Sequence, residues 1–184
     1  MSTTTWQIDP THTAIEFGVK HMMFTTVRGS FGAFEGEVSL DAENPSNSSV
    51  AVKIDTSSLD TGVADRDNHL RSGDFFDVET FPQITFRSTS VSGPIVEGGT
   101  FEIVGELTIR DVTREVVLEA TFDGTGTDPW GGTRSGFGAT TKIDRRDFGL
   151  TWNQALETGG VLVGHDITIT LQVQAVLQQE LAAV

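Results

Sequence analysis

The chain has 184 residues, of which 37% are apolar and 21% charged, and we predict a single folded domain over residues 1–184. Its 26 acidic side chains outnumber its 12 basic ones, and the net charge of −14 repels nucleic-acid phosphates and anionic lipid head groups, which argues against a DNA-binding role and against a membrane-adsorbed role. The absence of cysteine excludes disulfides and thiolate chemistry.

The N-terminal part alternates apolar and polar residues with the period of two that half-buried strands show. We predict a first ordered piece at Trp6–Ile8, followed by strands over residues 13–21, 27–40 and 50–54. Within the strand over 27–40, the apolar residues move from odd to even positions around Gly32-Ala33. This shift predicts a β-bulge, which bends a strand as the closure of a barrel requires.

The alternation breaks between Thr61 and Phe81, where apolar side chains are crowded among charged ones. This segment predicts one or two short helical turns that press a few apolar side chains against the end of the sheet. The side-chain oxygen of Asp65 or Thr61 is expected to cap the first turn, and Gly73 is expected to end it.

The rest of the chain returns to strands, and a tight connection at Arg110–Arg114 predicts a hairpin. About eight antiparallel strands at this spacing, with no long helix between them, favour an all-β barrel over a sandwich because a barrel leaves no exposed edge. The tail over residues 177–184 is expected to be frayed or to form a short helical end. The predicted later strands cover residues 84–86, 101–109, 116–122, 137–143 and 163–175.

Familiar catalytic motifs are missing from the sequence: it has no nucleophile elbow, phosphate-binding loop or dinucleotide fingerprint. The four histidines have no ligand spacing, so we predict no metal site and no cofactor, and expect each histidine to hold a hydrogen bond at a sheet end. Ion pairs near the barrel mouth are expected to clamp the helical segment to the sheet. The candidates are Arg66, Asp67, Arg145, Arg146 and Asp147.

The chain has 12 phenylalanines and no tyrosine, and this composition bears on the chemistry of the barrel interior. An interior lined by phenylalanine offers no hydroxyl group and holds water poorly. Both a solid core and an elongated dry cavity are consistent with this count, so the composition alone leaves the two open.

Several motifs, taken together and in order, resemble the YceI-like family of lipocalin-like, polyisoprenoid-binding bacterial proteins. Thr13 stands where serine is common, and Asp111 replaces a usual glycine. The motifs are Asp9-Pro10-Thr11-His12-Thr13, Val27–Phe31, Asp65–Ser72 followed by Asp74–Val78, Phe81-Pro82, Gly105–Thr113 and Arg146–Gly149.

The resemblance implies an eight-stranded antiparallel, lipocalin-like β-barrel with a short helical segment closing one end. It also implies that the bore binds an amphipathic isoprenoid lipid, such as a polyprenyl phosphate or an isoprenoid quinone, for transport, storage or sequestration without catalysis. His21, Arg66 and His69 are the polar candidates at the mouth. The predicted lining is Phe17, Val19, Phe31, Phe34, Val38, Val52, Ile54, Leu70, Phe75, Phe76, Ile84, Phe86, Leu107, Phe122, Phe137, Phe148, Trp152 and Ile169.

Two other hypotheses stay open at this point. One is an enzyme that acts on a lipid head group at the barrel mouth. The other is a solid barrel that acts through its surface, for example as a homodimer that uses the outer face of the long last strand. The N-terminus lacks the basic and apolar regions of a secretory signal, which predicts a cytoplasmic protein, or a periplasmic one if a leader has been trimmed. No apolar run reaches the roughly 20 residues that span a bilayer, so no stable membrane insertion is expected.

Overall fold

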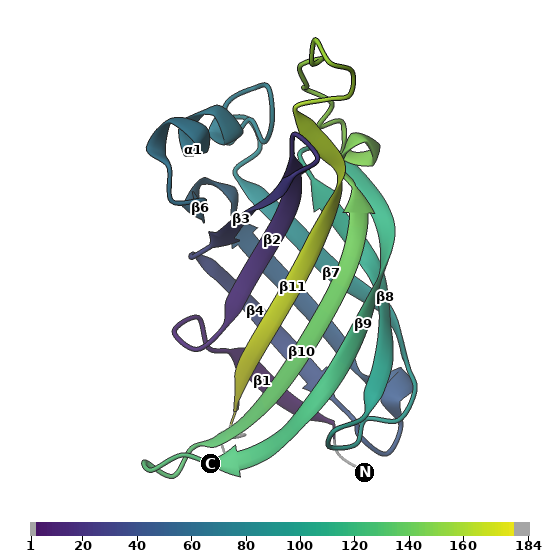
Figure 1. Cartoon of the computed structure of the whole chain (residues 1–184). Coiled ribbons are helices and arrows are strands. Elements are labelled where there is room, and N and C mark those ends of the chain that lie inside the picture. Colours follow the sequence, from purple (N-terminus) through teal and green to yellow (C-terminus); the bar gives the residue numbers. More distant parts are fainter. Residues whose placement is uncertain (1–2, 179–184) are drawn as a thin grey trace.

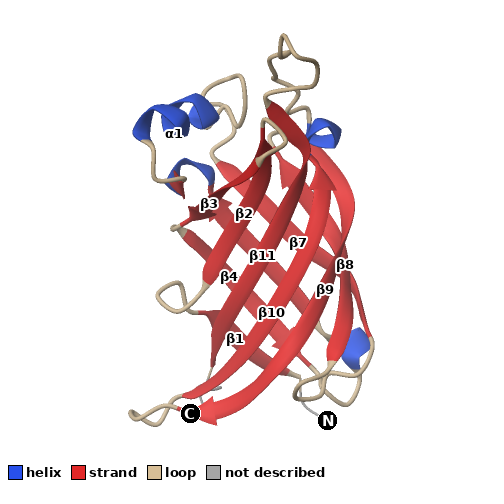
Figure 2. Ribbon diagram, in the orientation of Figure 1, coloured by secondary structure: helices blue, strands red, loops and turns tan. Residues whose placement is uncertain are grey.

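The computed structural model describes residues 3–178, and its strands wrap around one central axis (Figures 1 and 2). The helical elements are α1 (Ala64–Arg71) and the short 3-10 turns η1 (Pro45–Asn47), η2 (Thr56–Ser58) and η3 (Arg145–Phe148). The strands are β1 (Thr4–Ile8), β2 (Ala14–His21), β3 (Thr25–Phe31), β4 (Phe34–Leu40), β5 (Ser49–Asp55), β6 (Leu59–Asp60), β7 (Gln83–Ser92), β8 (Thr100–Ile109), β9 (Val112–Thr127), β10 (Thr133–Asp144) and β11 (Val163–Leu177).

Eight of these strands close into an antiparallel ring in the order β1-β4-β5-β7-β8-β9-β10-β11. The ring closes because β1 pairs with the end of β11, with Trp6 opposite Leu177 and Ile8 opposite Ala175. The predicted eight-stranded antiparallel barrel is therefore confirmed, and so is the β8–β9 hairpin. The described part of the predicted tail continues β11 to Leu177, and residues 179–184 lie outside the described residues.

The predicted β-bulge within one long strand is wrong, because Gly32-Ala33 is a break between two strands, β3 and β4, that have different partners. β3, before it, pairs with β2 and β6, whereas β4, after it, pairs with β1 and β5. The Gly32 N–H donates to the Ser58 carbonyl, and the Ala33 carbonyl accepts from the Asp55 N–H. These two hydrogen bonds hold the break beside η2. Phe31 before the break and Phe34 after it both pack in the same apolar core.

The predicted helical turn is confirmed as α1, which lies beside β3 and β6 at the upper end of the barrel in Figure 1. The predicted caps are wrong: Val63 is the N-cap, without a side-chain bond, and Ser72 is the C-cap. Thr61 is used differently, because its N–H and its hydroxyl both donate to the buried carboxylate of Asp67. This contact holds the start of the segment against the barrel.

The prediction that ion pairs clamp the helical segment to the sheet is also wrong, because other contacts hold it. Arg66 donates to the hydroxyl and carbonyl oxygens of Thr61, both at 2.7 Å, and Arg71 donates to the Leu59 carbonyl at 2.7 Å. Of the five proposed residues, only Arg146 forms an ion pair among the described residues, with Asp144 at 2.6 Å. The helical segment is therefore held by hydrogen bonds to backbone and hydroxyl groups, whose geometry the sequence pattern does not encode.

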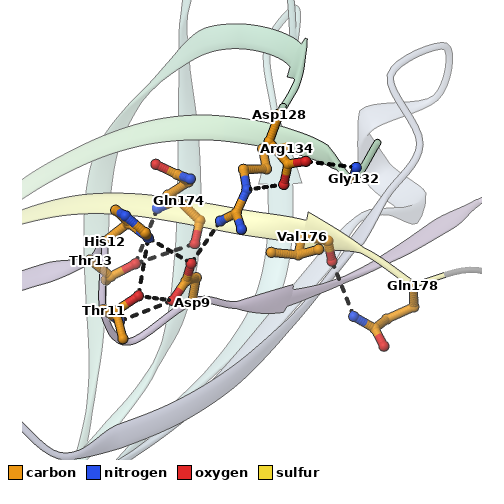
Figure 3. Close-up of polar contacts among 10 residues, drawn as sticks. All are labelled: Asp9, Thr11, His12, Thr13, Asp128, Gly132, Arg134, Gln174, Val176 and Gln178. Atoms are coloured by element: carbon orange, nitrogen blue, oxygen red, sulfur yellow. Dashed lines mark hydrogen bonds and ion pairs between the residues drawn. The ribbon is translucent and has the colours of Figure 1, made fainter. Parts of the chain in front are cut away.

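A polar network centred on Asp9 ties the β1–β2 connection to the β9–β10 turn (Figure 3). One Asp9 carboxylate oxygen contacts Arg134 at 2.7 Å and His12 Nδ1 at 2.8 Å, and the other accepts from the Thr11 N–H and hydroxyl. Arg134 also donates to Asp128 at 2.8 Å. The hydrogen bonds from His12 and Thr11 are the main reason that the pKa of Asp9 lies well below its ordinary value of 3.8.

This lowered pKa predicts an acid-dependent contribution to stability. Because the folded-state pKa lies below the unfolded one, the contribution is present above about pH 4 and is lost as the pH falls toward the folded-state value. We expect Asp9→Asn to lower the free energy of unfolding by about 1–2 kcal/mol at pH 7, since it weakens hydrogen bonds to a charged group. Urea unfolding at pH 7 and pH 3 should show this difference shrinking in acid; a difference independent of pH would contradict it.

Candidate ligand-binding cavity

The upper part of the barrel encloses a cavity of about 530 Å³, within the range of roughly 300–1,000 Å³ that ligand sites occupy. Its wall is built from inward-facing residues at alternate positions of the strands, as the period-two pattern dictates. Side chains from α1 and the turns after it, and from the loop before β11, complete the wall. The strand residues include Ile15, Phe17, Val19, Val27, Phe31, Val52, Ile54, Ile84, Phe86, Leu107, Val116, Leu118, Ile167, Ile169, Leu171 and Val173.

A second, smaller cavity of about 100 Å³ continues the first toward the other end of the barrel. The two share part of their apolar wall, including Val52, Phe86 and Leu171. Leu40 and Phe101 line this second cavity and belong to a core cluster, with Trp6 and Ala175, that fills the barrel around it. The free space is therefore concentrated at the α1 end, and the opposite end of the barrel is largely filled by side chains.

The burial of the inward-facing residues shows that the interior is not solid. Phe17, Ile54 and Phe86 point into the barrel but are only half-buried, whereas Trp6 and Ala175 in the core cluster are fully packed. Close-packed interiors leave few voids larger than a water molecule. The hypothesis of a solid barrel is therefore contradicted by the geometry of the bore.

Most of the predicted lining residues lie on one of these two cavities. Val38 and Phe137 line the smaller one. The thirteen on the larger one are Phe17, Val19, Phe31, Val52, Ile54, Leu70, Phe75, Phe76, Ile84, Phe86, Leu107, Trp152 and Ile169.

Phe34, Phe122 and Phe148 line neither cavity, which corrects their predicted position. Phe148 belongs to η3 rather than to a strand, and its side chain is buried in the upper core. The Phe122 ring packs against Phe137 at a centroid distance of 5.4 Å, beside a β-bulge that shifts the register. Phe34 packs against the core directly after the Gly32-Ala33 break.

The prediction also missed several aliphatic wall residues, because it gave most weight to phenylalanine. Ile167, Leu171 and Val173 lie on the same face of β11 as Ile169, and all four line the large cavity. The signal that would have found them is the alternation itself, which continues along the whole of β11.

The three polar candidates, His21, Arg66 and His69, all line the large cavity, together with Lys20 and Asp65. His69 Nε2 lies 2.8 Å from an Asp74 carboxylate oxygen. The His69 ring also stands edge-on to Phe75 at 5.1 Å and to Trp152 at 4.6 Å, measured between ring centroids. His69 is thus fixed in orientation at the junction between the polar rim and the apolar bore.

Arg145 is a buried cation of the cavity wall that the sequence did not reveal. It is 4% exposed and donates to four backbone carbonyls. Burial lowers the pKa of its guanidinium. Arg145 forms no ion pair with a carboxylate among the described residues; its guanidinium contacts carbonyl dipoles and lies over the Phe75 ring, 6.0 Å from its centroid. The accepting carbonyls are those of Leu150, Trp152, Val163 and Gly164.

Within residues 3–178, His, Asp and Glu side chains nowhere gather in a group of three or more that fits a metal ion. In the same range, no helix has the length and apolar character needed to cross a bilayer.

The chain matches the model of the YceI-like domain over residues 6–175. It is 46% identical over 140 residues to Protein YceI of Salmonella newport, a match that covers 76% of this chain and 72% of that protein. A UPF0312 protein of Vibrio cholerae is 44% identical over a segment with the same coverage.

Solved structures with the same fold include a YceI protein of Campylobacter jejuni. It is 27% identical, with a TM-score of 0.72, and the match covers 87% of this chain and 90% of that one.

Two more distant structures show the fold alone. Burkholderia cenocepacia BcnA has a TM-score of 0.78 and 23% identity, over 91% of this chain and 98% of that chain. A polyisoprenoid binding domain from Saccharophagus degradans has a TM-score of 0.68 and 13% identity, over 96% of this chain and 100% of that chain. The motifs, the barrel and these matches agree, and the chain belongs to the YceI-like domain family.

Proposed function

We propose that the protein binds an amphipathic isoprenoid lipid, a polyprenyl phosphate or an isoprenoid quinone, and carries, stores or sequesters it without chemical change. The observation that carries this proposal is the apolar bore, a cavity of about 530 Å³ at the α1 end that continues into a smaller one of about 100 Å³ toward the filled end of the barrel. The description of the Saccharophagus degradans neighbour as a polyisoprenoid binding domain supports the same class of ligand.

The chemistry of the bore suits a branched hydrocarbon tail. Each buried CH₂ group contributes about 0.8 kcal/mol, so a tail of several isoprene units gains much of its affinity from burial alone. The lower cavity is lined mainly by aliphatic and phenylalanine side chains, which select length and girth rather than polar groups. The head group then lies among Lys20, His21, Arg66 and His69 at the α1 end, where hydrogen-bond donors are concentrated.

The arrangement of the polar residues favours binding over catalysis at the mouth. An acid–base site needs two titratable groups that converge on one reacting atom. His69 and Asp74 contact each other, and among the described residues the His21 side chain forms no hydrogen bond to either of them; the Arg66 guanidinium, which donates to Thr61, is a cation rather than an acid–base group at neutral pH. We therefore assign His21, Arg66 and His69 to head-group contact, with the bound lipid itself as the only ligand.

The proposal predicts that the protein purified from bacteria carries an isoprenoid lipid. Native mass spectrometry should show a mass shift that disappears on denaturation, and organic extraction should recover the lipid for identification. Protein stripped of lipid should bind a short-tailed ubiquinone with a Kd in the micromolar range or below, which corresponds to about −8 kcal/mol. The absence of both the co-purified lipid and quinone binding would contradict the proposal.

A further inference from the structure

The turn between β2 and β3 carries three consecutive large apolar side chains that point into solvent. Met22, Met23 and Phe24 are 37%, 66% and 79% exposed. Single apolar residues on a surface are ordinary, but a contiguous exposed group often marks an interaction site. We call residues 22–24 the apolar tip.

The backbone of the apolar tip has a conformation that is energetically unfavourable for methionine. Met22 and Met23 have φ values of 51° and 64°, in the left-handed region where hairpin turns prefer Asn and Gly. The turn is nevertheless fixed, because the Phe24 N–H donates to the His21 carbonyl at 3.0 Å and the Met22 N–H donates to the Leu162 carbonyl at 2.8 Å. A polar Asn-Gly pair would make this turn more easily, so the tip's side chains are not explained by the hairpin itself.

The apolar tip stands directly beside the mouth of the cavity. It extends β2, whose Val19, Lys20 and His21 line the cavity, and Leu162, which anchors it, also lines the cavity. In Figure 1 the β2–β3 turn lies at the same end of the barrel as α1. The other hairpin turn at this end, between β8 and β9, consists of the polar residues Arg110 and Asp111. Of these two turns the tip is the apolar one, and Val63 at the start of α1, which is 47% exposed, adds a further apolar side chain at this end.

The chemistry of the tip and the charge of the protein define the surface that it fits. The three tip side chains are themselves thioether and phenyl groups, which enter the boundary between head groups and acyl chains by burial of apolar area. The basic side chains near them, Lys20, His21 and Arg66, line the cavity, where they are assigned to the head group of the bound lipid. The net charge of −14 opposes approach to an anionic membrane. A neutral, zwitterionic bilayer lets the apolar side chains be buried and does not repel the acidic protein.

We infer that the apolar tip docks the mouth of the barrel transiently on a zwitterionic lipid bilayer, so that a lipid passes between membrane and bore without crossing water. The inference rests on the proposed function for its cargo. Its physical basis is separate, because contact between the tip and a bilayer requires only the exposed side chains and their place at the mouth. Three side chains on a turn provide a reversible contact, consistent with the expectation of no stable membrane insertion.

The test replaces the tip with the residues that such a turn prefers, in the variant Met22→Asn/Met23→Gly/Phe24→Ser. This variant is expected to fold at least as well as the natural chain, because Asn and Gly accept positive φ. The matched control is Trp130→Ser, which removes a side chain that is 87% exposed in the β9–β10 turn, at the opposite end of the barrel. A Phe24→Ser single variant serves as a milder second change.

Two measurements separate docking from binding. Flotation of lipid-free protein with phosphatidylcholine vesicles reports docking, and quenching of tryptophan fluorescence by a short-tailed ubiquinone reports binding, since Trp152 lines the cavity. We expect the triple variant to bind ubiquinone in solution like the natural chain. We expect its uptake of ubiquinone from the vesicles to be about tenfold slower or more, because each buried apolar side chain contributes to docking. The Trp130→Ser control should take up ubiquinone at the natural rate.

Three results decide the matter. Natural uptake and flotation by the triple variant would overturn the inference. A dimer of the natural chain in gel filtration that the triple variant loses, without flotation of either protein, would also overturn it and assign the tip to a second copy. If the natural chain binds no ubiquinone in solution, the proposed function fails, whereas tip-dependent flotation of the empty protein would still support docking and its absence would refute it.

Discussion

Replacing Ile169 with tryptophan is expected to abolish lipid binding while the barrel stays folded. Ile169 lies on the cavity wall at the middle of β11, opposite Phe17 on β2 and Thr141 on β10. An indole at this position would extend across the bore and occupy space that the lipid tail needs. We expect the affinity for a short-tailed ubiquinone to fall at least about a hundredfold, which corresponds to roughly 2.7 kcal/mol.

The same substitution is expected to cost little stability, because it fills existing space. Overpacking a dense core costs about 1–3 kcal/mol, and we expect Ile169→Trp to stay at or below the lower end of that range. Gly105 is a poorer position for such a test. A Cβ atom there would lie 2.4 Å from the Phe86 ring and 2.7 Å from the Arg87 carbonyl, so destabilisation would obscure any loss of binding.

The matched control is Thr168→Trp, which places the same indole on the exposed outer face of the same strand. Both variants need an equilibrium urea unfolding curve and a ubiquinone titration. Loss of binding by Ile169→Trp alone, with similar unfolding curves, supports a ligand inside the bore. Unchanged binding by Ile169→Trp would place the ligand elsewhere and refute the proposed function.

Local periodicity explains how much of the fold the sequence could predict. The alternation that includes Phe17 and Ile169 identified the strands and their inward faces, because side chains of a strand point to opposite faces in turn. The same pattern could not distinguish a bulge from a break at Gly32-Ala33. Both shift the apolar phase by one residue, and the choice depends on which strands pair with β3 and β4.

The cavity itself lay beyond the reach of the sequence for a different reason. Twelve phenylalanines are consistent with a solid core, and the free space depends on the barrel radius and on how far the core cluster around Trp6 and Phe101 extends. The strand pattern yields no prediction for Met22, Met23 and Phe24, which fall between the predicted strands over 13–21 and 27–40. Their importance comes from where the fold places the turn that they form.

Arg145 and Arg146 are two adjacent residues whose different environments also depend on the fold and could not be predicted from the sequence. In the sequence they form an exposed-looking pair, and both were assigned to ion pairs. In the structure η3 ends at Phe148, and the left-handed conformation of Gly149 lets the chain turn back, so that the following loop wraps around Arg145 but not around Arg146. Which of two adjacent arginines the following loop will bury cannot be predicted from the residue types alone.

We therefore expect Arg145→Met to destabilise the protein strongly and Arg146→Met to have little effect. Loss of the Arg145 guanidinium removes a donor from the carbonyls of Leu150, Trp152 and Gly164, whereas the Val163 carbonyl keeps its hydrogen bond from the Asn153 side chain; we expect the free energy of unfolding to fall by about 3 kcal/mol or more. Arg145→Lys should not restore it, since an ammonium group cannot reproduce the planar fork that reaches carbonyls on both sides. Arg146 contributes an exposed ion pair with Asp144, a kind of contact that adds little to stability.

Hydrogen exchange of the loop after η3 distinguishes this account from a general loss of stability. The Arg145 donors hold Trp152 and Val163, which line the cavity, so the Arg145→Met loop should exchange faster than the barrel strands under native conditions. The Arg145→Met variant should also bind ubiquinone more weakly, because one wall of the bore is no longer fixed. Equal stability of the two methionine variants would mean that the carbonyls that lose Arg145 find other donors, and that the buried guanidinium does not organise this side of the mouth.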